Sequence, residues 1–201
     1  CLLSRGLGDV YKRQNIMIKT IKIILVIMFS FFASEFNKKK SKKAPMSIYD
    51  ISINNIEGSE ISLSDYKGKY ILFVNVASNC GFTRQYRDLQ QLYDENSDKL
   101  VVVGVPCNQF GAQEPGNEDQ ISIFCSEKYD VTFPMTEKTY VRGSNQHPLY
   151  KWLTSKELNG RKNSSVKWNF QKYLVDKDGN LIDYWYSLTS PMSSKITNYI
   201  K

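Results

Sequence analysis

The sequence has little of the chemistry that metal sites and disulfide scaffolds require. Its 201 residues contain a single histidine, His147, and four cysteines, which are Cys1, Cys80, Cys107 and Cys125. No two cysteines have the close spacing of a zinc knuckle. The three that follow Cys1 are too few, and odd in number, for a disulfide-stapled scaffold. We therefore predict no metal site, and we favour reactive thiol chemistry.

The sequence also lacks a Cys-x-x-Cys pair, because Gly-Phe-Thr follows Cys80. A dithiol mechanism within one helical turn is therefore excluded, and a reactive Cys80 needs a distant or external partner. His147 stands directly before Pro148, at the start of a predicted helix. We expect His147 to have no catalytic role.

The N-terminal region has no apolar run of the ~20 residues that a spanning helix needs. Instead, the apolar run at 23–33 follows Lys19 and Lys22, a pattern typical of secretory signal peptides. We predict a signal peptide at 17–34 and export, with a periplasmic location. The alternative is an uncleaved membrane anchor, because Phe31 and Phe32 occupy positions where a cleavage site prefers small residues.

Two further segments flank this signal. Residues 1–16 precede Met17 and fit no structural period, so we interpret them as a non-native leader. Residues 35–45 include the run KKKSKK, which indicates a solvated basic linker. The domain itself is predicted at 46–201.

The net charge of +7 is confined to the N-terminal region. Ten Lys or Arg residues and two acids precede residue 46, so the first 45 residues carry +8 and the remainder carries −1. A near-neutral domain does not attract a phosphate backbone, so we predict no nucleic-acid partner.

Hydrophobic periodicity over 46–201 predicts an α/β domain with a central mixed sheet flanked by helices. Strands are predicted at 69–77 and 100–105, with a hairpin at 47–64 and another formed by 170–175 and 181–186. Helices are predicted at 84–96, 117–129, 148–155 and 193–200. Asn117 and Gln120 are expected to form a capping box.

Three loops carry residues suited to chemistry. Cys80 lies between a buried strand and a helix, where free backbone amides favour a nucleophilic thiolate. The loop 106–116 contains two neutral donors, Gln109 and Gln113, and follows the second buried strand. Trp168 offers an N–H donor, although taken alone it is more typical of core packing.

The segments NVASNCGFT, PCNQFGAQEPG, FCSEKYDVTFPM, HPLYKWL and VKWNFQKYLVDKDGN together resemble the glutathione peroxidases, in order and in spacing. The resemblance covers about 46–201. It implies a thioredoxin-like fold with an added N-terminal β-hairpin, and a peroxidase that reduces hydrogen peroxide and organic or lipid hydroperoxides in the response to oxidative stress.

The resemblance also implies a role for each site residue. Cys80 takes the place of the peroxidatic residue, and Gln113, Trp168 and Asn169 complete a catalytic tetrad. Cys125 takes the place of the resolving cysteine of the selenium-free subgroup, which forms an intramolecular disulfide. Cys107 we interpret as structural, because it follows a buried strand.

No cofactor is expected, only an external thiol reductant. The resemblance favours a thioredoxin-type protein over glutathione. The short segment between His147 and Trp168 resembles that of monomeric relatives. Two alternatives stay open at this point: a redox relay or sensor that passes its disulfide to a partner protein, and a binding domain without catalysis.

Overall fold

The computed structural model describes residues 22, 24–25, 27–28 and 46–200. The chain divides into two units, Cys1–Ala44 and Pro45–Lys201. In the first unit, the described residues are helical and exposed. The predicted leader (1–16), the predicted linker (35–45) and most of the predicted signal peptide (17–34) lie outside the described residues. No helix among the described residues is both long enough and apolar enough to cross a bilayer.

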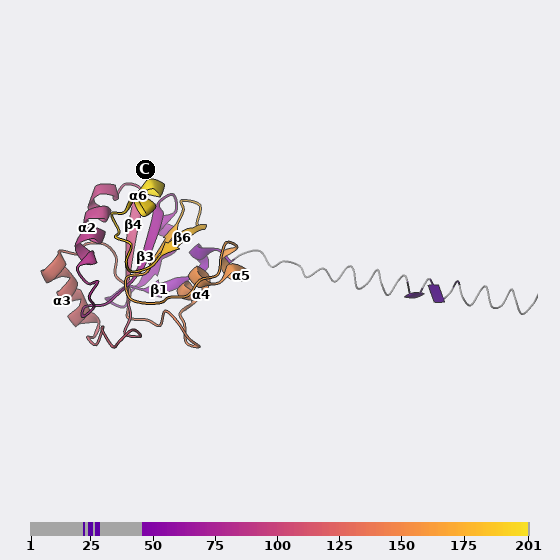
Figure 1. The fold of residues 1–201 in the computed structure, drawn as a ribbon, viewed down its shortest axis with the longest axis horizontal. Helices are drawn as coiled ribbons and strands as arrows, with labels where there is room; N and C mark the ends of the chain where they lie inside the picture. Colours follow the sequence, from indigo (N-terminus) through magenta and orange to yellow (C-terminus); the bar gives the residue numbers. More distant parts are fainter. Residues whose placement is uncertain (1–21, 23, 26, 29–45, 201) are drawn as a thin grey trace, which may run out of the picture. The chain divides into compact units, whose positions relative to one another are not determined.

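A four-stranded sheet organises the second unit, in the order β4-β3-β5-β6 (Figure 1). The strands are β3 (Tyr70–Val76), β4 (Leu100–Pro106), β5 (Lys172–Val175) and β6 (Leu181–Trp185). β3 and β4 are parallel, whereas β5 runs antiparallel to both β3 and β6. The ends of β3 and β4 therefore meet the start of β5 at one edge of the sheet.

A hairpin and five short helices surround this sheet. The hairpin pairs β1 (Ser52–Asn54) with β2 (Glu60–Ser62), and the 3-10 turns η1 (Ile48–Asp50) and η2 (Leu63–Tyr66) flank it. The helices are α2 (Gln85–Asn96), α3 (Glu118–Tyr129), α4 (Pro148–Thr154), α5 (Lys156–Asn159) and α6 (Ser194–Ile200).

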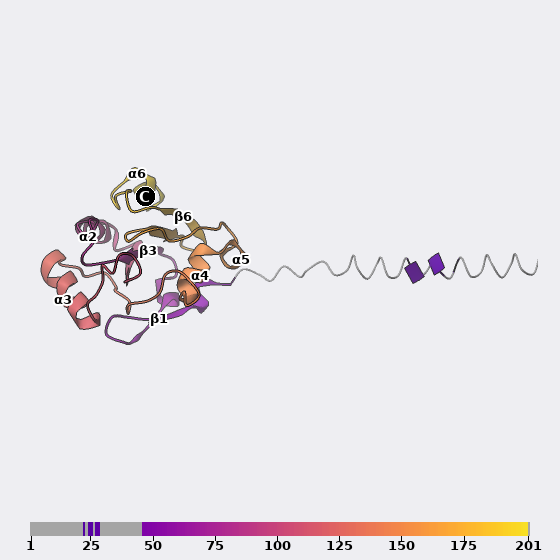
Figure 2. The ribbon, with the colours of Figure 1, turned by 60° about the horizontal axis from the view of Figure 1, so that its bottom comes forward.

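Side-chain alternation along the strands creates two cores, one on each face of the sheet. Ile71 and Phe73 pack with the hairpin and α4, whereas Leu72 and Val74 pack with α2, α3 and α6. Figure 2 shows α6 on one side of the strands and β1 with α4 on the other. Cys107 belongs to the first core, and Cys80 and Cys125 belong to the second.

The structure confirms the two predicted hairpins, the parallel buried strands and the capping box of α3. The predicted start of a strand at Phe170 is wrong. Phe170 has φ 63, which no extended strand can adopt, so β5 begins at Lys172. Helix α5 was not predicted, because its four residues are too few to show a period.

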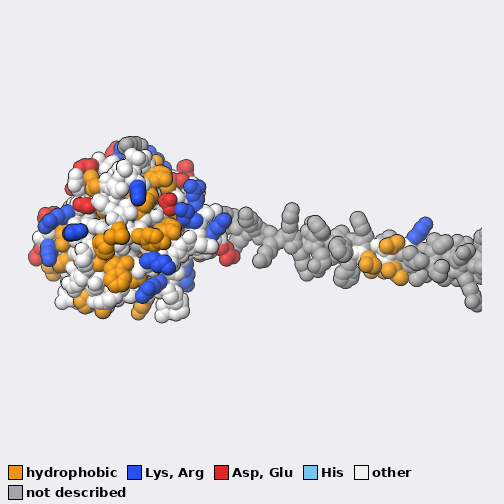
Figure 3. Space-filling model, viewed as in Figure 1, with side chains coloured by type: hydrophobic (Ala, Val, Ile, Leu, Met, Phe, Trp, Pro, Cys, Tyr) orange, Lys and Arg blue, Asp and Glu red, His pale blue; other side chains and the backbone are white. Residues whose placement is uncertain are grey.

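Positive and negative side chains are interspersed on the face of the second unit seen in Figure 3. No large area of one sign is visible there. This distribution agrees with the near-neutral charge calculated for residues 46–201.

Candidate active site

Cys80 lies in a tight turn that directly follows β3. Thr83 holds this turn together: its hydroxyl accepts a hydrogen bond from the Cys80 amide at 2.9 Å and donates to the Ala77 carbonyl at 2.8 Å. The amide of Phe82 donates to Cys80 Sγ at 3.4 Å, which stabilises negative charge on the sulfur. Cys80 was expected directly before a helix, but α2 begins only at Gln85. The amide that contacts the sulfur therefore belongs to the turn.

Gln113 and Asn169 meet although 56 residues separate them in the sequence. Asn169 Nδ2 donates to Gln113 Oε1 at 3.0 Å, which leaves the Gln113 amide nitrogen as a donor. The backbone carbonyl of Gln113 accepts a hydrogen bond at 3.0 Å from the backbone amide of Asn79, which directly precedes Cys80. The loops after β3 and β4 and the segment before β5 are thereby joined at one edge of the sheet.

Asn169 is fully buried, and its Oδ1 atom has no hydrogen-bond partner among the described residues. A buried acceptor without a partner is rare in folded proteins and costs free energy.

Trp168 is not part of the core, because 40% of its surface is exposed. Its ring packs on Phe110 at 5.8 Å between centroids, and its carbonyl accepts from Asn75 Nδ2 at 3.1 Å. The core-packing interpretation of Trp168 is therefore wrong. The indole is anchored on one side and accessible on the other.

Backbone strain is concentrated next to these residues. Ala112 has φ 51 directly before Gln113, and Phe170 has φ 63 directly after Asn169. Such angles cost a non-glycine residue on the order of 1–3 kcal/mol, and they cluster at functional sites. The strain indicates that the loops are shaped for the positions of Gln113 and Asn169.

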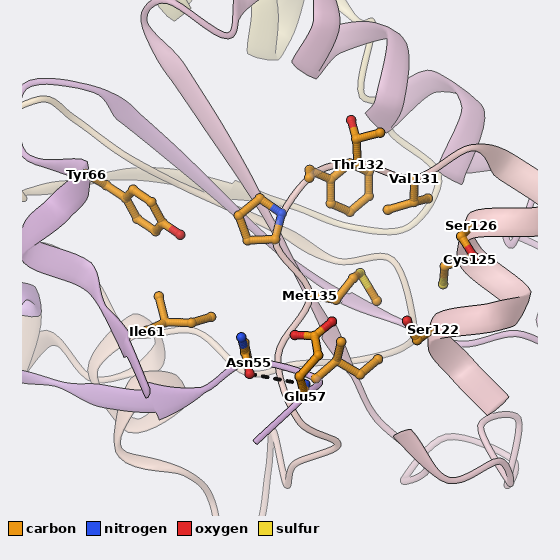
Figure 4. A pocket seen from close by; sticks show the side chains of 13 residues that line it. Asn55, Glu57, Ile61, Tyr66, Ser122, Cys125, Ser126, Val131, Thr132 and Met135 are labelled. Carbon is orange, nitrogen blue, oxygen red and sulfur yellow. Dashed lines mark hydrogen bonds between the residues drawn. The ribbon is translucent and has the colours of Figure 1, made fainter. Parts of the chain in front are cut away.

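Cys125 lies on α3 and is 2% exposed. Burial raises the pKa of Cys125 to about 11; the Tyr86 hydroxyl opposes this rise and the charge of Glu114 adds to it. Cys125 also lines a surface pocket of about 390 Å³. Figure 4 shows its side chain on the α3 wall of this pocket, beside Ser122 and Ser126.

The sequence of the second unit matches that of a known peroxidase family. The family model for glutathione peroxidase matches residues 48–154. The hydroperoxy fatty acid reductase gpx1 of Synechocystis is 45% identical over 157 residues, which cover 74% of this chain and 92% of that protein. This chain belongs to the glutathione peroxidase family. It is accordingly a thiol peroxidase.

Further comparisons agree with this assignment. The glutathione peroxidase-like peroxiredoxin 2 of Saccharomyces cerevisiae is 45% identical over 148 residues, covering 73% of this chain and 91% of that protein. The crystal structure of apo Trgpx aligns with a TM-score of 0.60 at 40% identity, covering 77% of this chain and 95% of that one. A thioredoxin-family thiol:disulfide interchange protein from Chlorobium tepidum aligns with a TM-score of 0.56 at 15% identity, covering 78% and 97%. The fold of the peroxidase domain is thioredoxin-like.

Cys107 and His147, which we do not predict to be catalytic, both make contacts that stabilise the fold. Cys107 is fully buried, and its sulfur accepts from the Gln109 amide at 3.4 Å. His147 caps α4, because its Nδ1 accepts from the Leu149 amide at 3.2 Å. Among the described residues, no group of three or more His, Cys, Asp or Glu side chains could hold a metal ion.

Two buried charged residues of the peroxidase were not predicted from the sequence. Lys172 is fully buried in β5, and its ammonium donates to Gln85 Oε1 and to the carbonyls of Ser187 and Thr189. Glu114 is 1% exposed although it follows Gln113 in an irregular loop. Neither residue stands out in the sequence, because burial of a charge depends on tertiary packing.

Proposed function

We propose that the enzyme reduces hydrogen peroxide and organic hydroperoxides, lipid hydroperoxides included, through Cys80. The observation that carries the proposal is the convergence of Gln113 and Asn169 on the loop of Cys80. The Cys80 sulfur attacks one peroxide oxygen, the O–O bond breaks, and the other oxygen leaves as water or an alcohol after taking a proton. Cys80 becomes a sulfenic acid.

The surrounding amides have complementary tasks in this step. The amide N–H of Gln113 and the indole N–H of Trp168 stabilise charge on the attacking sulfur and on the leaving oxygen. Asn169 orients the side chain of Gln113 through the hydrogen bond from its Nδ2 to Gln113 Oε1. Preorganised dipoles of this kind need no rearrangement during the reaction.

A lipid-like substrate is supported by the surface beside the turn of Cys80. Phe82 and Leu188 line a pocket of about 350 Å³ together with Arg84, Arg87 and the acidic Asp88. Leu188 is 86% exposed. Apolar side chains next to two cations and one carboxylate suit an acyl chain that carries a polar head group. The Synechocystis relative is named a hydroperoxy fatty acid reductase.

The catalytic cycle then continues through Cys125. Its thiol attacks the sulfenic acid of Cys80, which gives an intramolecular disulfide and water. A disulfide needs Cα atoms within about 7 Å, so we propose that α3 partly unwinds in this step. A thioredoxin-type protein reduces the disulfide, in line with the name peroxiredoxin of the yeast relative.

A parallel assay tests the cycle. Turnover of peroxide is measured with a thioredoxin system and, separately, with glutathione, and peptides are mapped by mass spectrometry after one equivalent of peroxide. We expect a Cys80–Cys125 disulfide and thioredoxin-driven turnover. Cys125→Ser should consume one equivalent and then stall, whereas the matched control Cys107→Ser should turn over normally. A Cys80–Cys107 link, or full turnover of Cys125→Ser with thioredoxin, would refute the two-cysteine cycle.

We further propose that the protein acts as an exported monomer. The basic residues before the apolar run at 23–33 support export. The short connection between His147 and Trp168 supports the monomer. Cell fractionation and light scattering of the purified chain test the two statements separately; a cytoplasmic pool or a stable oligomer would contradict them.

A further inference from the structure

The peptide group that joins Asn169 to Phe170 is held by hydrogen bonds at both ends. Its N–H, which belongs to Phe170, donates to the Asn75 carbonyl of β3 at 2.6 Å. Its carbonyl, which belongs to Asn169, accepts from the Ser187 hydroxyl at 2.5 Å. Strand β3 and the segment after β6 therefore fix the plane of this peptide group between them.

The same peptide group is held in a strained orientation. A peptide group is planar, so its rotation changes the angle ψ of Asn169 and the angle φ of Phe170 together. The φ of Phe170 is 63, a left-handed value that is unfavourable for a bulky side chain. Rotation of the group would relieve this strain, but it would also displace Asn169, whose side chain donates to Gln113 Oε1 at 3.0 Å.

The register of the sheet brings Ser187 to this position. Lys172 of β5 pairs with Trp185 of β6, and the two strands are antiparallel. Ser187 follows Trp185 by two residues, so it comes opposite Phe170, which precedes Lys172 by two residues. Ser187 is 6% exposed, so little water can compete for its hydroxyl.

Two buried side chains in turn hold the backbone of Ser187. Its carbonyl accepts from Gln85 Nε2 at 2.6 Å and from Lys172 Nζ at 3.4 Å. The ammonium of Lys172 also donates to Gln85 Oε1 and, at 2.7 Å, to the Thr189 carbonyl. Hydrogen bonds from an ammonium group are stronger than those between neutral groups, so the segment after β6 is firmly fixed.

These contacts complete a ring of hydrogen bonds that begins and ends in the turn of Cys80. The amide of Gln85, the first residue of α2, donates to the Phe82 carbonyl of this turn at 2.9 Å. Ser187 connects this α2 side of the ring to the side that carries the tetrad amides. The order along the ring is the Cys80 turn, Gln85, Ser187, Asn169, Gln113 and again the Cys80 turn.

We propose that Ser187 is a positioning residue of the peroxide step and acts through Asn169. The Ser187 hydroxyl keeps the strained peptide group in place, and Asn169 in turn keeps the side-chain amide of Gln113 directed at the peroxide. Gln85 and Lys172 anchor Ser187 itself. This inference rests on the roles proposed above for Gln113 and Asn169.

The test is a double-mutant cycle of Ser187→Ala and Asn169→Ala, with formation of the sulfenic acid measured by stopped flow under single turnover. Ser187→Ala should react about 10- to 10²-fold more slowly with hydrogen peroxide, because a displacement of about 1 Å can cost about 10²-fold. Since Ser187 acts through Asn169, the double variant should be no slower than Asn169→Ala. Independent contributions would multiply instead.

Two further variants separate positioning from stability. Thr136 is also buried, and its hydroxyl donates to a backbone carbonyl, that of Glu137, at 2.9 Å. Thr136→Val removes this bond outside the ring, so it should lower the melting temperature and leave the rate constant unchanged. Ser187→Thr keeps the hydroxyl and should react at close to the wild-type rate.

Four outcomes overturn the inference. A wild-type rate constant in Ser187→Ala beside a slow Asn169→Ala shows that the peptide group stays in place without the hydroxyl, and leaves the role of Asn169 intact. A double variant slower than Asn169→Ala by the full factor of Ser187→Ala shows that Ser187 acts independently. Equal losses in Ser187→Thr and Ser187→Ala assign the effect to packing. A wild-type rate constant in Asn169→Ala refutes the proposed role of Asn169 as well.

Discussion

At the scale of single residues, one hydrogen bond supports the roles that we propose for Gln113 and Asn169. The bond from Asn169 to Gln113 uses the carbonyl oxygen of Gln113 and so points its donor away from Asn169. The same bond leaves Asn169 Oδ1 free. We propose that this contact orients the Gln113 amide toward the peroxide.

Removing either donor should slow the first chemical step. We expect Gln113→Ala or Trp168→Phe to lower the second-order rate constant with hydrogen peroxide by about 10²–10³-fold, since one preorganised donor contributes about 2.7–4 kcal/mol. Stopped-flow kinetics under single turnover measure this rate directly. Thermal unfolding should change little in Trp168→Phe, because the indole is half exposed. Unchanged rate constants in both variants would contradict the assignment of the tetrad.

At the scale of helices and strands, sequence patterns predicted those features that depend only on neighbouring residues. The capping box of α3 needs only Asn117 and Gln120, and the DKDGN turn needs only Gly179 at φ 84. The local pattern could not predict the left-handed Phe170, because contacts with β3 impose it: its amide donates to the Asn75 carbonyl at 2.6 Å. Likewise, nothing local predicts that Lys172 lies under α2.

Lys172 ties elements together and should make stability depend on pH. Burial lowers its pKa to about 7, although the nearby carboxylate of Asp88 opposes this shift. The unfolded chain keeps the proton up to about pH 10.5. Between these two values the unfolded state binds more protons, so raising the pH favours the folded state, by at most about 1.4 kcal/mol per unit.

Urea unfolding at pH 7, 7.5, 8 and 8.5 measures this effect. The free energy of unfolding should rise with pH more steeply in the wild type than in Lys172→Met, which cannot titrate. The exposed Lys167→Met is the matched control and should keep the wild-type slope. Parallel curves for the wild type and Lys172→Met would show that Lys172 keeps its proton in the folded state throughout, held by its three oxygen acceptors.

At the scale of the whole molecule, the sheet separates the two cysteines of the proposed cycle from Cys107. Cys80 and Cys125 belong to the core beneath α2 and α3, whereas Cys107 belongs to the core on the opposite face. The parallel order of β3 and β4 follows from the strand–helix–strand pattern of the sequence. The meeting of Gln113, Asn169 and the Cys80 turn does not, because it requires the insertion of β5 beside β3. That insertion became predictable only through the family resemblance.

The second unit should fold and react without the residues before it. Every buried hydrophobic side chain among the described residues lies between Ile48 and Ile200, so the two cores are complete within this unit. A chain that begins at Pro45 should therefore keep the melting temperature and the peroxide rate constant of the full protein. It should lose retention on a cation exchanger at pH 7, because removing a segment of charge +8 leaves −1. Differential scanning calorimetry, stopped-flow kinetics and ion-exchange elution check the three statements.

A lower melting temperature of the short chain would mean that residues before Pro45 contribute to the cores. A retained affinity for the cation exchanger would mean that the domain has a basic face of its own.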